Sequence, residues 1–153
     1  MEHEGMVHAL EEIHRLLKPA GTLIEIHPSL EGPPLVEVWS NGGRSFSEED
    51  PGFDYAGDLR QAEAAVASVV ERGMFLLEDR RRFELRTHAE SVEELRDHWE
   101  VAGAYDPEEM EETLVLRRDE MYARAHAAME DAARPSEVVY VEPATMSRLT
   151  PSG

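Results

Sequence analysis

Three side chains of this sequence have the types and spacing that acid–base chemistry needs. Glu25 and His27 are two residues apart in a run of apolar and β-branched residues. On a strand they would share one face, about 6.5–7 Å apart. His27 ends this predicted strand and His88 ends another, and α/β proteins bind ligands at the carboxyl ends of parallel strands. We expect Glu25, His27 and His88 to be substrate-side candidates, and hydrated strand-end side chains without a ligand are the alternative.

A second pair of side chains has a spacing that could bind a metal ion. Glu11 and His14 are three residues apart, which is the spacing of ligands in di-iron helical bundles. That chemistry needs a second Glu-x-x-His pair and two further carboxylates, and the sequence contains no second copy of the pair. We therefore expect a solvated helix face at these residues and no metal site.

A set of aromatic and methionine side chains could line an apolar pocket, although such residues more often form a core. The set is Trp39, Phe46, Trp99, Tyr105, Met121, Tyr122 and Met129. The serines lie in predicted caps and turns, and neither a Gly-x-Ser-x-Gly elbow nor a P-loop occurs. The sequence therefore predicts core packing for the aromatic set and assigns no catalytic residue.

The composition excludes several classes of function. The chain has 153 residues and a formal net charge of -18, which would repel nucleic acids and anionic membrane surfaces. Because cysteine is absent, disulfides, zinc–thiolate sites and cysteine nucleophiles are excluded. No apolar run approaches the roughly 20 residues of a membrane span, and Glu2 and Glu4 stand where a signal peptide would be basic. We expect a cytoplasmic protein without a nucleic-acid or membrane partner.

The elements that position these residues begin with a helix, a turn and a strand. Residues 6–17 carry an apolar stripe at helical spacing. Pro19 cannot continue that helix, and Gly21 permits a tight turn. Residues 22–27 are apolar and β-branched, which favours a strand.

The rest of the sequence alternates between strand and helix patterns. The Asn41-Gly42 pair predicts a β-hairpin over residues 35–47. The further predicted elements are strands over residues 74–88 and 136–146 and helices over residues 58–71, 91–99 and 107–133, the last two capped by Ser91 and Asp106. Residues 150–153 are expected to be a frayed tail, so residues 1–149 are predicted to form a single α/β domain.

Two segments resemble a known family. Residues 9–28 read Ala-Leu-Glu-Glu-Ile-His-Arg-Leu-Leu-Lys-Pro-Ala-Gly-Thr-Leu-Ile-Glu-Ile-His-Pro. This segment resembles the helix, Leu-Lys-Pro-Gly-Gly turn and strand of class I S-adenosylmethionine-dependent methyltransferases, with Ala20 in place of the first glycine. Residues 82–91 resemble the end of strand six in a subset of that family. The family's strands run in the order three-two-one-four-five-seven-six, and residues 22–27, 74–88 and 136–146 resemble strands five, six and seven.

The resemblance implies both a fold and a function. The fold is α/β: a partial, Rossmann-like methyltransferase sheet of mixed strand direction, with packed helices and an added β-hairpin. The function is that of the C-terminal, substrate-side portion of a methyltransferase, which uses S-adenosylmethionine and a small-molecule substrate in the full-length family.

One family motif is missing, because the sequence contains no Gly-x-Gly and so lacks the Gly-rich cofactor turn. We expect that this chain alone binds no cofactor and does not transfer methyl groups. The predicted strand over residues 22–27 would also lose its family neighbour, strand four, which favours a homodimer or a complex with a separately encoded N-terminal half. The alternative function is a non-enzymatic dimerisation or small-ligand-binding module on the same scaffold.

Overall fold

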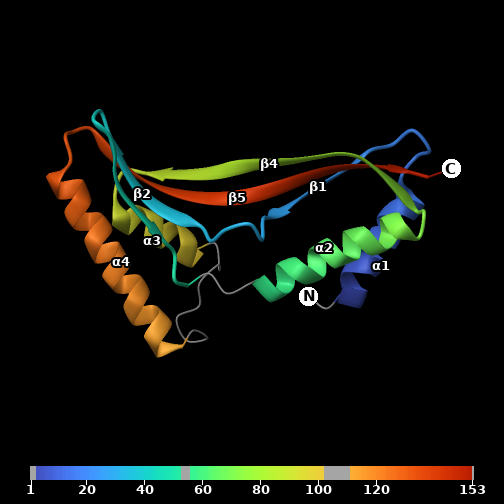
Figure 1. Cartoon of the computed structure of the whole chain (residues 1–153), viewed down its shortest axis with the longest axis horizontal. Helices are drawn as coiled ribbons and strands as arrows, with labels where there is room; N and C mark the ends of the chain where they lie inside the picture. The colour runs from blue at the N-terminus through green and yellow to red at the C-terminus, as the bar shows by residue number, and fades with distance from the viewer. Residues whose placement is uncertain (1–2, 53–55, 102–110, 153) are drawn as a thin grey trace. The chain divides into compact units, whose positions relative to one another are not determined.

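The computed structural model describes residues 3–52, 56–101 and 111–152 (Figure 1). In chain order the elements are α1 (His3–Leu16), β1 (Leu23–Pro28), β2 (Leu35–Ser40), β3 (Gly43–Glu49), α2 (Ala56–Glu71), β4 (Phe75–Ala89), α3 (Val92–Val101), α4 (Glu112–Asp131) and β5 (Ser136–Pro151). These elements confirm the predicted α/β class. Among the helices described, none is long and apolar enough to cross a membrane.

The C-terminal strand, β5, is the common partner of three other strands. β1 pairs antiparallel with residues 144–149 of β5, and β2 pairs antiparallel with residues 136–141. β3 pairs with β2 in the predicted hairpin, and β4 also pairs with β5. Ser152 N donates to Met74 O beyond one end of β4, and His88 contacts Glu137 near its other end, so β4 and β5 run antiparallel.

The strand directions correct one prediction. The sheet is antiparallel, so the prediction of mixed strand direction is wrong. β1 and β4 do not pair with each other, because β5 lies between them and is antiparallel to both. The order of the three strands is nevertheless the one that the resemblance implies for strands five, seven and six.

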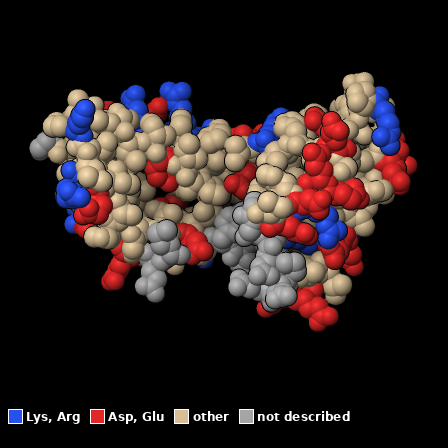
Figure 2. Space-filling model, turned by 180° about the vertical axis from the view of Figure 1, so that it is seen from behind, with Lys and Arg blue, Asp and Glu red and all other residues tan. Residues whose placement is uncertain are grey.

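The chain divides into two compact units, where the sequence predicted one domain. Unit 1 consists of Met1–Gly32, Asp54–Glu84 and Pro143–Gly153, and unit 2 consists of Pro33–Phe53 and Leu85–Glu142. β4 and β5 contribute residues to both units. The charge is unevenly distributed, since unit 1 has 13 acidic and 8 basic residues and unit 2 has 20 acidic and 7 basic residues. Figure 2 shows acidic side chains gathered over the helical part of unit 2.

Unit 1 packs α1 and α2 together and against the sheet. Its buried core is small and mostly aliphatic: Leu10, Ala65, Val69, Phe75 and Leu149. The turn between α1 and β1 forms as the sequence predicted, with Gly21 N donating to Lys18 O over 2.8 Å. A Cβ atom at Gly21 would lie 2.9 Å from that same oxygen, so the close approach requires glycine.

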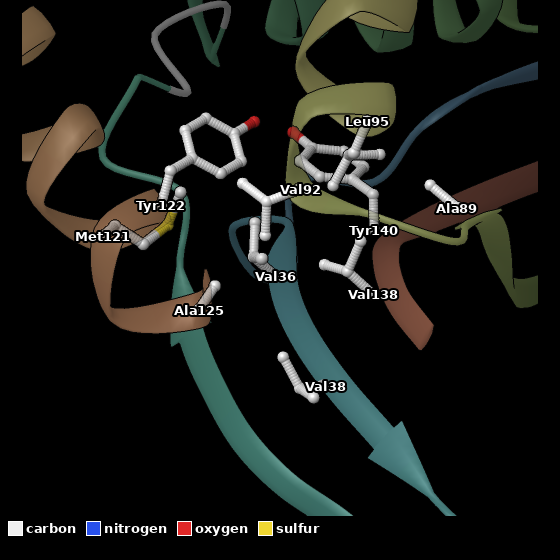
Figure 3. Close-up of a cluster of buried hydrophobic side chains, with 10 residues drawn as sticks. All are labelled: Val36, Val38, Ala89, Val92, Leu95, Met121, Tyr122, Ala125, Val138 and Tyr140. Atoms are coloured by element: carbon white, nitrogen blue, oxygen red, sulfur yellow. The ribbon is translucent and has the colours of Figure 1, made fainter. Parts of the chain in front are cut away.

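Unit 2 has a larger and more aromatic core, drawn in Figure 3. The buried residues come from β2, β5, α3, α4 and the end of β4: Val36, Val38, Ala89, Val92, Leu95, Met121, Tyr122, Ala125, Val138 and Tyr140. Phe46, Trp99 and Met129 pack against this cluster. The core prediction for most of the aromatic and methionine set is therefore confirmed, while Tyr105 lies outside the described residues.

Two element boundaries differ from the prediction. β5 continues to Pro151, so Thr150 belongs to a strand and not to a frayed tail, and its hydroxyl donates to Glu78 over 2.9 Å. α4 begins at Glu112, and the predicted cap at Asp106 lies outside the described residues. The Ser91 cap of α3 is confirmed, because Glu94 N donates to Ser91 Oγ over 3.0 Å.

Candidate functional site

Glu25 and His27 share one face of β1, as their spacing predicted, and their side chains are in contact. His27 Nδ1 donates to Glu25 Oε1 over 2.6 Å. His27 is only 7% exposed, so this charge-assisted hydrogen bond is shielded from water. The pairing of β1 with β5 fixes both residues, with Glu25 opposite Ser147 and His27 opposite Thr145.

A second carboxylate reaches the same imidazole from α2. Glu63 Oε1 lies 3.4 Å from His27 Nε2 and 3.0 Å from Arg80 Nη2 of β4. The imidazole therefore lies between two carboxylates, one from its own strand and one from a helix of the same unit. We call Glu25, His27, Glu63 and Arg80 the His27 cluster.

The carboxylates of the His27 cluster favour the charged form of the imidazole. The hydrogen bond to Glu25 raises the pKa of His27 above its usual value, although burial of the ring opposes the rise. The contact with Glu63 adds to the increase. Glu25 Oε2 is buried and has no hydrogen-bond partner among the described residues. The cluster can thus hold a proton on His27 and accept one further hydrogen bond at Glu25.

His88, the third predicted candidate, belongs to unit 2 and has a different partner. Its Nδ1 lies 3.0 Å from Glu137 Oε2, and both side chains are about half exposed. The structure therefore brings Glu25 and His27 together, adds Glu63 to them, and gives His88 a separate carboxylate.

The pair at metal-ligand spacing makes other contacts. Glu11 Oε1 lies 2.7 Å from Arg72 Nη1. The His14 ring packs edge-on against Phe75, with 5.1 Å between the ring centroids. Within residues 3–52, 56–101 and 111–152, no group of three or more His, Asp or Glu side chains has the arrangement of a metal site.

Glu63 is the site residue that sequence reasoning missed. It lies in α2 four residues after Leu59 and three before Val66, which is the spacing of one helix face. A carboxylate within an otherwise apolar stripe was the available signal, because a charge on that face needs a partner. The identity of the partner could not be predicted, since His27 is 36 residues away in the sequence.

No protein-family model, curated protein or solved structure matches this chain. The methyltransferase resemblance therefore stays a prediction that rests on residues 9–28 and 82–91.

Proposed function

We propose that this chain is the substrate-side portion of an S-adenosylmethionine-dependent methyltransferase. The observation that carries the proposal is the strand order, in which β5 lies antiparallel between β1 and β4. That order agrees with strands five, seven and six of the family. A second observation supports the proposal independently. The order of α1, the Lys18–Gly21 turn and β1 is the helix, turn and strand order in which residues 9–28 resemble the family.

The His27 cluster is the proposed substrate-facing group. His27 stands near the carboxyl end of β1, held by Glu25 on one nitrogen and facing Glu63 on the other. In this role the imidazole of His27, in the neutral form that it takes above its raised pKa, receives the proton that an acceptor hydroxyl or amine gives up, and the two carboxylates stabilise the resulting imidazolium. The buried Glu25 Oε2 provides an acceptor for a substrate hydrogen-bond donor.

The residues of this chain do not themselves fit the cofactor. The sequence contains no Gly-x-Gly turn, and S-adenosylmethionine would need a backbone that approaches it closely. The proposal therefore requires that other residues, from another polypeptide or segment, hold the cofactor.

A reconstitution experiment tests the proposal. Extract from cells that lack the gene is supplied with purified protein and S-adenosylmethionine labelled at the methyl group, and label transfer to small molecules is measured. We expect the wild-type chain to restore one labelled product and the His27→Ala variant to restore little. The His88→Ala variant, which changes the histidine of unit 2, measures whether that residue also contributes. If the wild-type chain restores no labelled product, the proposal is wrong.

A calorimetric titration adds a second check. The purified chain alone is expected to give no binding heat with S-adenosylmethionine at micromolar concentrations, because the Gly-rich turn is missing. Tight binding by the isolated chain would contradict the division of roles proposed here.

A second candidate function is a non-enzymatic module that assembles through β1. Among the described strands β1 pairs only with β5, so its other edge offers unpaired backbone groups. Ile24 and Ile26 on this strand are 48% and 58% exposed. The predicted hairpin pairs with residues 136–141 of β5.

Light scattering across a range of ionic strength tests the assembly role. We expect self-association to increase with salt, because screening weakens the repulsion between chains of net charge -18. The Ile26→Lys variant should remain monomeric, while Leu116→Lys, at an exposed position of α4, should behave as the wild type does. A wild-type chain that stays monomeric at high salt and high concentration would eliminate this role.

A further inference from the structure

Unit 2 contains an open depression beside the turn of the β2–β3 hairpin. Its volume is about 900 Å³, and it is lined by residues from the hairpin, the end of β4 and the start of β5. The lining residues that matter are Trp39, Asn41, Glu90, Arg134 and Glu137. All of them belong to the same unit, so the depression does not depend on any other part of the chain.

The indole of Trp39 is held in place from behind. Its Nε1 donates to Glu37 Oε2 over 2.8 Å, and Glu37 is 3% exposed. Glu37 also accepts hydrogen bonds from Arg44 over 2.7 Å and from Ser47 over 3.3 Å. Burial alone would raise the pKa of Glu37, but the hydrogen bonds from Trp39 and Arg44 lower it below the usual value. An ionised carboxylate that accepts three hydrogen bonds therefore fixes one edge of the indole, and Trp39 lines the depression.

The charges around that surface are mainly negative. Two carboxylates, Glu90 and Glu137, line the depression with one guanidinium, Arg134. An adjoining smaller depression shares Glu90 and Arg134 and adds Glu93 and Glu130. Among the described residues, neither the Glu90 carboxylate nor the Arg134 guanidinium makes a hydrogen bond or an ion pair.

The remaining ionic partners of these carboxylates are histidines. Glu137 contacts His88, and Glu93 contacts His126 over 3.6 Å. Among the described residues, neither Glu137 nor Glu93 has an ion pair with an arginine or a lysine. The excess of acidic residues in unit 2 adds a field that attracts cations toward the depression.

We propose that this depression binds a small organic cation with a substituted ammonium group. An ammonium that carries methyl groups is attracted to the electron-rich face of an indole and to nearby carboxylates at the same time. Trp39 supplies the face, and Glu90 and Glu137 supply the charge. Asn41 and Ser136 offer hydrogen-bonding groups for a polar substituent on the cation. This site is independent of the methyltransferase proposal, since it uses neither the His27 cluster nor S-adenosylmethionine.

The probe for the test is choline, compared with its uncharged isostere in which a tert-butyl group replaces the trimethylammonium. The two tryptophans of the chain, Trp39 and Trp99, give two indole N–H signals in a nitrogen–proton correlation spectrum. We expect millimolar choline to shift the Trp39 signal in a saturable way and to leave the Trp99 signal in place, because Trp99 packs against the core. The isostere should shift neither signal at the same concentration. An equal shift with the isostere, or no saturable shift of the Trp39 signal, would overturn the proposal.

Three single substitutions then test the charge arrangement without removing the buried Glu37. Glu90→Gln should weaken choline binding about threefold to fivefold, which is typical of losing one exposed opposite charge. Arg134→Gln removes the repelling cation and should strengthen binding by about the same factor. Glu49→Gln, an exposed carboxylate of β3 that does not line the depression, is the matched control and should change nothing. Equal effects of Glu90→Gln and Glu49→Gln, or weaker binding in Arg134→Gln, would show that the depression is not the site.

Discussion

The two units bury their charged groups with different chemistry. In unit 1 the buried cationic group is an imidazole, His27, between Glu25 and Glu63. In unit 2 it is the guanidinium of the buried Arg118, whose Nε lies 3.6 Å from Asp50 Oδ1. A guanidinium keeps its charge at every physiological pH, whereas an imidazole loses its charge near neutrality. A change in pH near neutrality therefore acts on the buried cation of unit 1 and not on that of unit 2.

The largest predicted effect comes from removing the buried carboxylate of unit 2. Asp50 accepts hydrogen bonds from Tyr140 over 3.1 Å and from Gly52 N over 2.9 Å, and it faces the Arg118 guanidinium. Asp50→Ala should lower the free energy of unfolding by about 3–5 kcal/mol, because it removes the buried carboxylate that faces the Arg118 guanidinium. Urea unfolding followed by tryptophan fluorescence measures this loss, since both tryptophans lie in unit 2.

The neighbouring Glu49 is the control for Asp50. It is exposed on β3, so Glu49→Ala should change the free energy of unfolding by less than about 0.5 kcal/mol. A loss below about 1 kcal/mol in Asp50→Ala would mean that unit 2 does not depend on its buried ion pair.

The next effect is expected in unit 1, where His27→Ala removes the imidazole between two carboxylates. Glu25 would then have no hydrogen bond from this ring, and its Oε2 is already buried without a partner among the described residues. We expect the free energy of unfolding to fall by about 1–3 kcal/mol. Far-ultraviolet circular dichroism during urea unfolding measures it. The half-exposed His88 is the control, and a loss as large in His88→Ala would remove the distinction between the two histidines.

A smaller effect is expected in the pH dependence of the free energy of unfolding, in which the two units differ. The pKa of His27 is raised in the folded chain, so its stabilising contribution is fully present below the unfolded value of about 6.5 and is lost as pH rises through the folded pKa. The free energy of unfolding should therefore decrease as pH increases above about 6.5. The groups that set this dependence are Glu25 on β1, Glu63 on α2 and Arg80 on β4.

The His27→Gln variant sharpens the pH prediction. Glutamine cannot titrate, so the variant should show a flatter decrease over the same pH range. Urea unfolding at several pH values measures both proteins. An identical slope in the wild type and the variant would show that another group controls the pH dependence.

The smallest predicted effect is on the surface of unit 2. Arg124 donates two hydrogen bonds to Glu48, over 2.8 and 2.7 Å, and both partners are partly exposed. Arg124→Gln should shift the urea midpoint less than His27→Ala does, and the shift should disappear at high salt because ions screen exposed pairs. A shift that persists in molar salt would show that this pair is shielded from solvent.

The parts of the fold that the sequence predicted are those with local causes. Pro19 and Gly21 determine the end of α1 and the turn, and the Asn41-Gly42 pair determines the hairpin. Gly43 follows that pair at a φ of 99°, a conformation that glycine adopts without strain. The alternation of Glu25 and His27 on one face was predictable for the same reason, because it depends only on the geometry of a strand.

The parts that the sequence did not predict depend on distant pairing. The predicted strand ends at residue 146, yet the next residue, the polar Ser147, belongs to β5 and is buried opposite Glu25. Pro143 looks unsuited to a long strand, but it lies between the segment that pairs with β2 and the segment that pairs with β1. Neither Glu63 nor Arg80 could be assigned to His27 without knowing which helix and strand are its neighbours.

The position of β5 in the chain has a consequence for synthesis on the ribosome. β1, β2 and β4 all pair with this strand, and it follows every other described element in the sequence. The β2–β3 hairpin can form early, but the other three pairings must wait until residues 136–151 have been made. Until then Ile24 and Ile26 belong to a strand without a partner. The nascent chain therefore passes through a stage in which its apolar strands are open to chaperones or to other chains.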